Sequence, residues 1–291
     1  MPPPTPPLVQ ICTGCDVPVD VTTEEPLAVL PCPTCGMEMT VKRSFNHFEA
    51  QEILGAGGMG TVYRALDPNL NRTVAIKLLR REYSNDHEFV SQFQREAEVT
   101  ASINHPHVVK VYSAGSDHGM LYIAMELVDK GSLDELMTRQ GNIEEAQALD
   151  VGIQIAHGLN AALQRGLIHR DIKPGNILFS NSHNAKIVDF GLAALMDEAG
   201  TVGGEIWGTP YYVAPEKLDN KPEDARSDIY SLGATLFHAI AGRPPFEADT
   251  SSIGTLKRLK SQPVNLQGFS PHISAPTAAI TPFGGECENA L

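Results

Sequence analysis

The residues best suited to chemistry form a short polar run near the middle of the chain. His169-Arg-Asp-Ile-Lys-Pro-Gly-Asn176 brings together an aspartate, a lysine and an asparagine, and Asp189-Phe-Gly191 follows. Carboxylate and amide oxygens are the ligands that a hard cation such as Mg²⁺ prefers, and a lysine beside them suits a phosphate. Gly191 leaves the backbone next to Asp189 conformationally free. The spacing therefore favours the chemistry of a nucleotide phosphate with its metal ion.

A glycine run earlier in the chain could bind phosphate through backbone N–H groups. Gly55-Ala-Gly57-Gly58-Met-Gly60 is weak evidence alone, because a G-x-G-x-x-G run also opens dinucleotide-binding folds. The following residues, 61–65, are strand-like, so the glycines are expected in a hairpin between two strands and not between a strand and a helix. A plain hairpin turn remains the alternative interpretation.

One lysine and one glutamate stand where apolar residues are expected. Lys77 interrupts the apolar strand 73–79, and Glu96 shares the apolar stripe of a predicted helix over 88–103. An unpaired charge pointing inward would cost several kcal/mol. We expect the two to pair and to hold the lysine against the α- and β-phosphates; a purely structural buried pair is the alternative.

Four of the five cysteines form two C-x-x-C pairs, Cys12 with Cys15 and Cys32 with Cys35. Such pairs can place four thiolates tetrahedrally around one Zn²⁺, with Gly14 and Gly36 allowing the tight turns. A redox C-x-x-C and two local disulfides are the alternatives. A redox site needs one such pair beside a βαβ pattern, which the sequence lacks. The remaining Cys287 needs no role.

Hydrophobic periodicity predicts the elements that position these residues. Strand-like runs at 48–54, 61–66 and 73–79 form an antiparallel meander, and the later chain is mainly helical. Asn142 and Glu145 match a capping box before a helix. No internal repeat is evident in the sequence.

Composition shifts divide the chain into five parts. Residues 1–9 are a Pro-rich stretch expected to be disordered, 10–39 a zinc ribbon, 40–47 a linker, 48–275 the large domain and 276–291 an irregular tail.

Composition also restricts the partners and the location. The chain has 291 residues, 42% of them hydrophobic, and a formal net charge of -13, which would repel nucleic acid and anionic lipid. Nucleic acid is therefore not an expected partner. The sequence has no apolar run long enough to span a membrane, and its proline-rich start lacks the parts of a signal peptide. We expect a cytoplasmic protein without a membrane segment.

These strings together resemble the eukaryotic-like Ser/Thr protein kinases, particularly the bacterial ones, whose glycine loop often reads as Gly57 to Tyr63 does here. The resemblance implies a two-lobed α+β fold, with an antiparallel β N-lobe carrying one helix and a helical C-lobe, preceded here by the zinc ribbon. It also implies transfer of the ATP γ-phosphoryl group to hydroxyls of protein substrates, including autophosphorylation.

The resemblance also implies a role for each matching residue. Asp171 accepts the proton of the substrate hydroxyl, Lys173 steadies the γ-phosphate, and Asn176 and Asp189 hold Mg²⁺ or Mn²⁺. Thr209 is expected to bond Asp171 and Lys173. The catalytic residues implied are Asp171, Lys173, Lys77, Glu96 and Thr209, and Asp228 is expected to tie down the catalytic-loop backbone.

A larger set is implied to bind ATP. Met125 is the expected gatekeeper, and Glu126 and Val128 are expected backbone partners of adenine; an ordinary buried strand is the alternative for this segment. The full set is Leu54, Gly55, Gly57, Gly58, Gly60, Val62, Ala75, Lys77, Met125, Glu126, Val128, Asn176, Leu178 and Asp189.

Regulation is predicted at the segment after the Asp-Phe-Gly string. Relatives with an arginine before the catalytic aspartate, as Arg170 here, usually await a phosphorylated loop whose charge that arginine binds. Glu205 occupies the position where relatives often carry the phosphorylated threonine, and Thr201 offers the other hydroxyl. A fixed carboxylate pairing with Arg170 and a phosphosite at Thr201 are both left open.

The resemblance weakens after Ser274. Further helices and an arginine that would pair with Glu216 are not found there, so the C-lobe is expected to be incomplete and self-association through uncovered surface becomes an expectation. A nucleotide-binding pseudokinase that acts as a scaffold is the rival function. Residues 10–39 contain no Lys or Arg, which argues against a nucleic-acid-binding ribbon.

Overall fold

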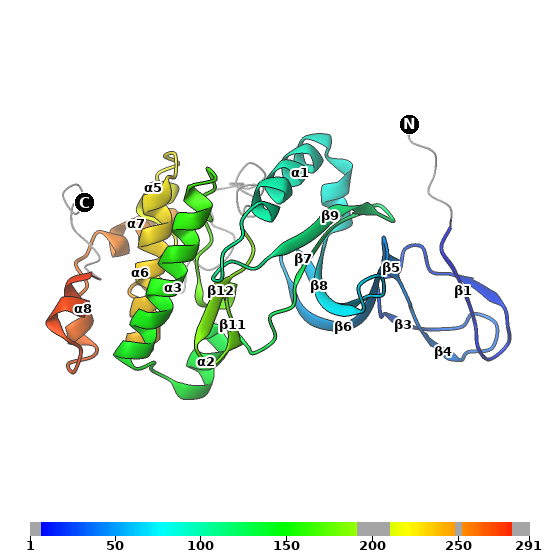
Figure 1. The fold of residues 1–291 in the computed structure, drawn as a ribbon, viewed down its shortest axis with the longest axis horizontal. Coiled ribbons are helices and arrows are strands. Elements are labelled where there is room, and N and C mark those ends of the chain that lie inside the picture. The colour runs from blue at the N-terminus through cyan, green and yellow to red at the C-terminus, as the bar shows by residue number, and fades with distance from the viewer. Residues whose placement is uncertain (1–6, 191–209, 248–251, 281–291) are drawn as a thin grey trace. The chain divides into compact units, whose positions relative to one another are not determined.

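The structure is a computed structural model that describes residues 7–190, 210–247 and 252–280. The chain forms two compact units. The first comprises Met1–Ala101 with Lys110–Leu127, and the second Ser102–Val109 with Val128–Leu291. Figure 1 shows the strands concentrated in the first unit and most helices in the second.

The first unit begins with two small antiparallel hairpins. Strand β1 (Val9–Ile11) pairs with β2 (Pro18–Asp20), and β3 (Val29–Pro31) pairs with β4 (Glu38–Thr40). Their side chains share a small core made of Cys12, Val19, Val21, Cys32, Met39 and Val41. The second hairpin repeats the first, so the structure contains an internal repeat that the sequence did not reveal.

Each hairpin turns at the residue after its second cysteine. Asp16 has φ 57° and Gly36 has φ 76°, both in the left-handed region. Asp16 N–H donates to Cys12 O over 2.9 Å, and Gly36 N–H donates to Cys32 O over 2.9 Å. In the tight turn that the sequence ascribed to Gly14, the left-handed residue is Asp16, and aspartate tolerates this conformation better than most residues.

A six-stranded antiparallel sheet follows, which confirms the expected meander. Its order is β5-β6-β7-β8-β10-β9. The bounds are Ser44–Phe45 for β5, Phe48–Gly57 for β6, Gly60–Asp67 for β7, Arg72–Leu79 for β8, Val111–Asp117 for β9 and Met120–Glu126 for β10.

Strand alternation gives this sheet two different faces. One face supplies a core that includes Phe45, Phe48, Tyr63, Ala65, Val74, Ile76, Leu78, Met120, Tyr122 and Ala124. Directly opposed residues in antiparallel strands point to the same face. Val62 opposes Lys77, Lys77 opposes Ile123, and Ala75 opposes Met125. These residues therefore share the face opposite the core cluster.

Residues 40–47, expected as a linker, are packed and partly paired. Val41 and Phe45 are fully buried, and Phe45 opposes Phe48 in the β5–β6 pair. The Arg43 guanidinium donates to the backbone oxygen of Val21. Because these residues hold the hairpins to the sheet, the ribbon and the sheet belong to one compact unit. Leu8, expected in the disordered start, packs against the ribbon core.

A 3₁₀ turn, η1 (Arg81–Asn85), leads into helix α1 (His87–Ala101). Asp86 caps the helix by accepting from Glu88 N–H over 2.9 Å and from Phe89 N–H over 3.1 Å. The buried side chains of the helix are Phe89, Phe93, Ala97 and Thr100. The predicted helix is confirmed, although it ends before Ile103.

The second unit is mainly helical. Helix α3 packs against α6, and the hairpin β11–β12 packs against α3 (Figure 1). Its elements are α2 (Leu133–Gln140), α3 (Glu145–Leu163), η2 (Pro174–Asn176), β11 (Ile177–Asn181), β12 (Asn184–Ile187), α5 (Pro215–Leu218), α6 (Ala225–Ala241), α7 (Ile253–Lys260), η3 (Leu266–Gly268) and α8 (Ala275–Ile280). A β-rich unit followed by a helical unit confirms the predicted two-lobed α+β fold.

Two polar contacts in this unit differ from the sequence expectations. Glu145 does not complete a capping box with Asn142; its carboxylate accepts from Ser274 N–H over 3.1 Å and from the hydroxyls of Ser274 and Thr277. These hydrogen bonds attach the start of α8 to α3, in a part of the chain where an irregular tail was expected. Glu216 accepts from the Ser227 hydroxyl. None of the helices in the described ranges combines the length and the apolar character that a membrane crossing requires.

Candidate active site and cysteine cluster

The geometry of the second unit centres on the Asp171 carboxylate. Lys173 Nζ lies 2.7 Å from Asp171 Oδ2, and Asn176 Nδ2 lies 2.9 Å from the same oxygen. Asn176 Nδ2 also donates to Asp171 O over 2.8 Å. Because its amide nitrogen serves both bonds, the Asn176 amide oxygen is the atom left for a cation. The structure thus brings together three residues that the sequence placed in one run.

The backbone before Asp171 is held by a buried carboxylate. Asp228 on α6 accepts from His169 N–H and Arg170 N–H, both over 2.8 Å. The predicted tie to Asp228 is confirmed. Arg170 has φ 67°, a conformation unfavourable for a residue with a side chain, and two charge-assisted bonds help to hold it there.

A fully buried histidine links this loop to the Asp189 segment. His169 Nε2 lies 2.8 Å from Val188 O, and Asp171 N–H donates to His169 Nδ1 over 3.2 Å. The two bonds fit the neutral tautomer with its proton on Nε2. Asp189 has φ 65°, so its backbone is also held in the left-handed region. Asp171 and Asp189 therefore sit on backbone segments joined through one buried ring.

In the first unit, the strand register arranges the residues expected to bind nucleotide. Gly55 opposes Val62, Val62 opposes Lys77, and Lys77 is only 6% exposed. Ala75 and Met125, also buried, face each other on the same side of the sheet. Glu96 lies on α1 in the same unit.

The glycines of the β6–β7 hairpin differ in what surrounds them. A Cβ atom on Gly60 would lie 1.9 Å from Leu78 O, so the strand needs glycine there for close packing. A Cβ on Gly55, Gly57 or Gly58 would meet no atom within 4 Å. Packing within the protein therefore explains the glycine at position 60. It does not explain the glycines at the other three positions.

The remaining predicted residues lie at the edges of these segments. Leu54 is 41% exposed on β6. Glu126 ends β10, where its N–H donates to Lys110 O over 2.8 Å. Val128 and Leu178 belong to the second unit and are half-buried, with Leu178 on β11. Their contact with a nucleotide stays a prediction.

The predicted regulatory residues are described only in part. Thr201, Glu205 and Thr209 lie outside the residues that the structure describes. Arg170 Nε lies 3.9 Å from Glu223, whose carboxylate is also 3.8 Å from Lys217 Nζ. The sequence analysis did not identify Glu223, because its ion pair with Arg170 joins residues that are distant in the chain and is formed only by the fold.

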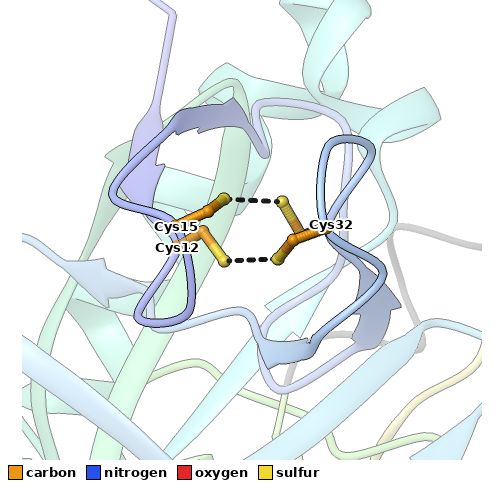
Figure 2. Close-up of side chains that lie close together, drawn as sticks. Cys12, Cys15 and Cys32 are labelled. Atoms are coloured by element: carbon orange, nitrogen blue, oxygen red, sulfur yellow. Dashed lines mark hydrogen bonds between the residues drawn. The ribbon is translucent and has the colours of Figure 1, made fainter.

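The four cysteine sulfurs of the ribbon form one cluster. They all lie within 4.8 Å of one another, and Figure 2 shows Cys12, Cys15 and Cys32 pointing inward from the two hairpins. Cys12 Sγ is 3.6 Å from Cys35 Sγ, and Cys15 Sγ is 3.7 Å from Cys32 Sγ. These separations are far longer than the disulfide bond of about 2.05 Å, so the cysteines are free thiols.

The backbone around the cluster favours a thiolate at Cys32. Hydrogen bonds from the N–H groups of Cys35 and Thr34 lower the pKa of Cys32 to about 6. At Cys15 a backbone hydrogen bond from Val17 lowers the pKa, but burial and the three neighbouring thiols together outweigh it and raise the pKa to about 12. A thiolate is the form that binds metal. The set of four thiols could therefore hold a metal ion.

Comparison with known proteins gives one consistent result. The family model described as the protein kinase domain matches residues 48–276. The chain is 37% identical over 233 residues to serine/threonine-protein kinase PrkC of Bacillus subtilis, covering 80% of this chain and 36% of that protein. It is 38% identical over 222 residues to PknA of Mycobacterium tuberculosis, covering 74% of this chain and 52% of that protein.

A solved structure gives the same result at the level of the fold. The Mycobacterium tuberculosis PknI kinase domain superposes with a TM-score of 0.63 at 31% identity, covering 81% of this chain and 86% of that one. Against the curated relatives, the chain spans between about a third and a half of their length.

Proposed function

Because the chain belongs to the protein kinase family, we propose that it transfers the γ-phosphoryl group of ATP to serine and threonine hydroxyls of protein substrates. The observation that carries this proposal is the Asp171 carboxylate, bonded to Lys173 and Asn176 on a backbone fixed by Asp228. A carboxylate held in this way can accept the hydroxyl proton as the phosphoryl group moves.

The metal role in this proposal belongs to Asn176 and Asp189. When bound, Mg²⁺ or Mn²⁺ neutralises the developing phosphate charge. The Asn176 amide oxygen is not used in the two bonds to Asp171, and the Asp189 carboxylate is an acceptor of the type that hard cations select. The donor set fits such an ion.

The phosphate role belongs to the glycine hairpin and Lys77. Gly55, Gly57 and Gly58 have open space where a side chain would begin, which leaves room for a ligand to approach the backbone N–H groups closely. Lys77, with Glu96 as its proposed partner, supplies a positive charge on the sheet face that also carries Val62 and Met125. Adenine contacts at Glu126 and Val128 complete the proposal.

The rival function, a pseudokinase scaffold, has less support. It depends on a missing part of the lower lobe, whereas Lys77, Asp171, Asn176 and Asp189 are all present. The relatives that match most of the chain carry the name serine/threonine-protein kinase.

Phosphoryl transfer from labelled ATP to a generic basic protein tests the two functions. Asp171→Asn should reduce the rate about 10²- to 10⁴-fold, the usual contribution of a general base. Asp150→Asn, an exposed aspartate on α3, is the matched control and should keep the wild-type rate. Equal transfer by wild type and Asp171→Asn, or none by either, would reject the kinase assignment.

For the cysteine cluster we propose a structural Zn²⁺ site. A tetrahedral ion with Zn–S bonds of about 2.3 Å places its sulfurs about 3.8 Å apart. The Cys12–Cys35 and Cys15–Cys32 separations of 3.6 and 3.7 Å fit this spacing. The zinc would hold the two hairpins together.

Regulation is proposed at Arg170, with two sources of negative charge still open. Glu205 could supply a permanent carboxylate, and phosphorylation of Thr201 could supply a stronger one. Two measurements distinguish the two sources of charge: initial rates of the Thr201→Ala and Glu205→Ala variants, and mass spectrometry of phosphatase-treated protein.

A thiol cluster and an ATP-dependent reaction both suit the cytoplasm, which we propose as the location. Self-association stays a prediction for sedimentation to test.

A further inference from the structure

A cavity of about 300 Å³ lies in the first unit, where the ribbon meets the sheet. Its lining comes from three parts of that unit. The residues are Leu8, Thr22, Arg43, Arg81, Asn85, His118 and Gly119. This volume reaches the lower end of the range for small-molecule sites. None of these residues belongs to the proposed active site or to the cysteine cluster.

Two guanidinium groups converge at this cavity. Arg43 Nη2 donates to Thr22 O over 3.2 Å, and Arg81 Nη2 donates to the same oxygen over 3.2 Å. Burial lowers the pKa of Arg43, and the neighbouring charge of Arg81 lowers it further. Glu24 and Glu25 oppose this effect from the ribbon side. Two like charges thus lie close together, one on the buried Arg43 and the other on the half-buried Arg81.

Three donor atoms of these two arginines have no hydrogen-bond partner. Arg43 is 4% exposed, yet its Nε and Nη1 atoms are both buried without a hydrogen-bond partner, and so is Arg81 Nε. A buried donor left without an acceptor costs about 1–3 kcal/mol, and more for a charged group. A negatively charged acceptor in the cavity would offset the positive charge that the two guanidinium groups bring to its lining.

Phosphate has the chemistry that these groups require. The planar fork of arginine presents parallel N–H groups that match phosphate oxygens, and such charge-assisted bonds are the stronger kind. The apolar side chain of Leu8 and the exposed Gly119 leave room beside the cations for the rest of a small molecule. The rim of the cavity includes Asn85.

We propose that this cavity, bounded by Arg43 and Arg81, is a binding site for a phosphate group, carried either by free phosphate or by a phosphorylated side chain. The proposal does not depend on the kinase activity. A ligand bridging Arg43 and Arg81 would also stabilise the packing of the ribbon against the sheet, because both arginines already donate hydrogen bonds to ribbon carbonyl oxygens.

Binding of inorganic phosphate to the nucleotide-free protein tests this directly. Titration calorimetry is done at constant ionic strength in the Lys77→Met background, so that the proposed nucleotide site contributes little. Saturable binding with about one equivalent is expected. Arg81→Gln should weaken it at least tenfold, whereas Arg80→Gln, an exposed neighbour in the chain, should change it less than twofold.

A second variant guards against loss of the fold. Asn85→Asp keeps the size of a rim residue, leaves every Arg43 and Arg81 hydrogen bond in place, and adds a negative charge. It should weaken phosphate binding at least tenfold without lowering the melting temperature. Absence of saturable binding up to about 20 mM, as expected of a cavity that holds water alone, or equal binding by wild type, Arg81→Gln and Asn85→Asp, would overturn the proposal.

A third titration identifies the source of the phosphate. O-phospho-L-threonine is compared with inorganic phosphate in the same background. Tighter binding of the amino acid assigns the site to a phosphorylated side chain, and equal or weaker binding assigns it to free phosphate.

Discussion

Gly60 and Gly58 show that neighbouring glycines can serve different purposes. At Gly60 an added Cβ would overlap Leu78 O, while at Gly58 it would meet nothing within 4 Å. The first glycine is therefore required by the protein's own packing. The second has no such requirement, and a ligand close to its backbone would explain it.

The alanine variants of these two glycines should separate packing from nucleotide binding. Gly60→Ala should lower the free energy of unfolding by about 1–3 kcal/mol, because the backbones of β7 and β8 must move apart. Gly58→Ala should change it by less than about 0.5 kcal/mol and yet weaken ATP binding. Urea unfolding and ATP titration measure the two effects. Unchanged ATP affinity in Gly58→Ala would contradict the close approach of the phosphates.

The sequence predicted that Asp171, Lys173 and Asn176 lie together, because the three residues are close in the chain. Asp171, Lys173 and Asn176 lie within one turn and loop, so their types and order nearly determine how they meet. The sequence did not predict the hydrogen bond from Arg43 to Val21 O or the ion pair between Arg170 and Glu223. Those interactions join residues distant in the chain, and no local pattern encodes them.

Among the elements, α7 is fixed to its surroundings by a buried lysine. Lys260 is 5% exposed, its Nζ lies 3.2 Å from Tyr211 O, and the ring centres of Tyr230 and Phe246 are 5.2 and 5.1 Å away. The carbonyl and the aromatic faces favour the charged amine. Burial has the larger, opposite effect and lowers the pKa of Lys260 to about 7.

This lysine should make stability depend on pH above neutrality. Between pH 7 and 10.5 the unfolded lysine is protonated and the folded one increasingly is not, so the free energy of unfolding rises with pH there. The slope is at most about 1.4 kcal/mol per pH unit. In urea unfolding at pH 7, 8 and 9, the stability of Lys260→Met relative to wild type should fall as the pH rises. Parallel curves for the two proteins would show that Lys260 stays charged in the fold.

The boundaries of elements were harder to predict where tertiary packing defines them. The strands at 48–54 and 73–79 follow from residue pattern and match β6 and β8 closely. Helix α8 does not follow from residue pattern, because its start is fixed by the hydrogen bonds of Ser274 and Thr277 to Glu145 on α3. Residues 40–47 were interpreted as a linker because the strand there, β5, has only two residues, too few for an alternating hydrophobic pattern.

At the scale of the whole molecule, the ribbon, the six-stranded sheet and α1 form one unit, and most of the helices form the other. The repeat within the ribbon escaped the sequence analysis because its hairpins share little beyond their cysteines and a few apolar positions. The structure also shows how the ribbon is held. Arg43 and Arg81 donate to Val21 and Thr22, which lie beside the strand carrying Val19 in the ribbon core.

Zinc removal should therefore affect the first unit beyond the ribbon itself. Purified protein should contain about one equivalent of zinc, and chelation or Cys32→Ser should release it. Losing the folded ribbon removes the acceptors of Arg43 and Arg81, so amide hydrogen exchange should become faster in β5, β6 and η1 as well as in β1–β4. Exchange in α3 and α6 of the second unit should stay unchanged.

The conservative variant Thr13→Ser provides the control for this experiment, because Thr13 lies between two of the cysteines, is exposed and offers no sulfur. It should keep both the zinc and the slow exchange of β5 and η1. Protein that holds less than about half an equivalent of zinc before chelation would refute the metal site. Faster exchange confined to β1–β4 after metal loss would instead show that the ribbon folds independently, in which case the buried Arg43 and Phe45 do not couple it to the sheet.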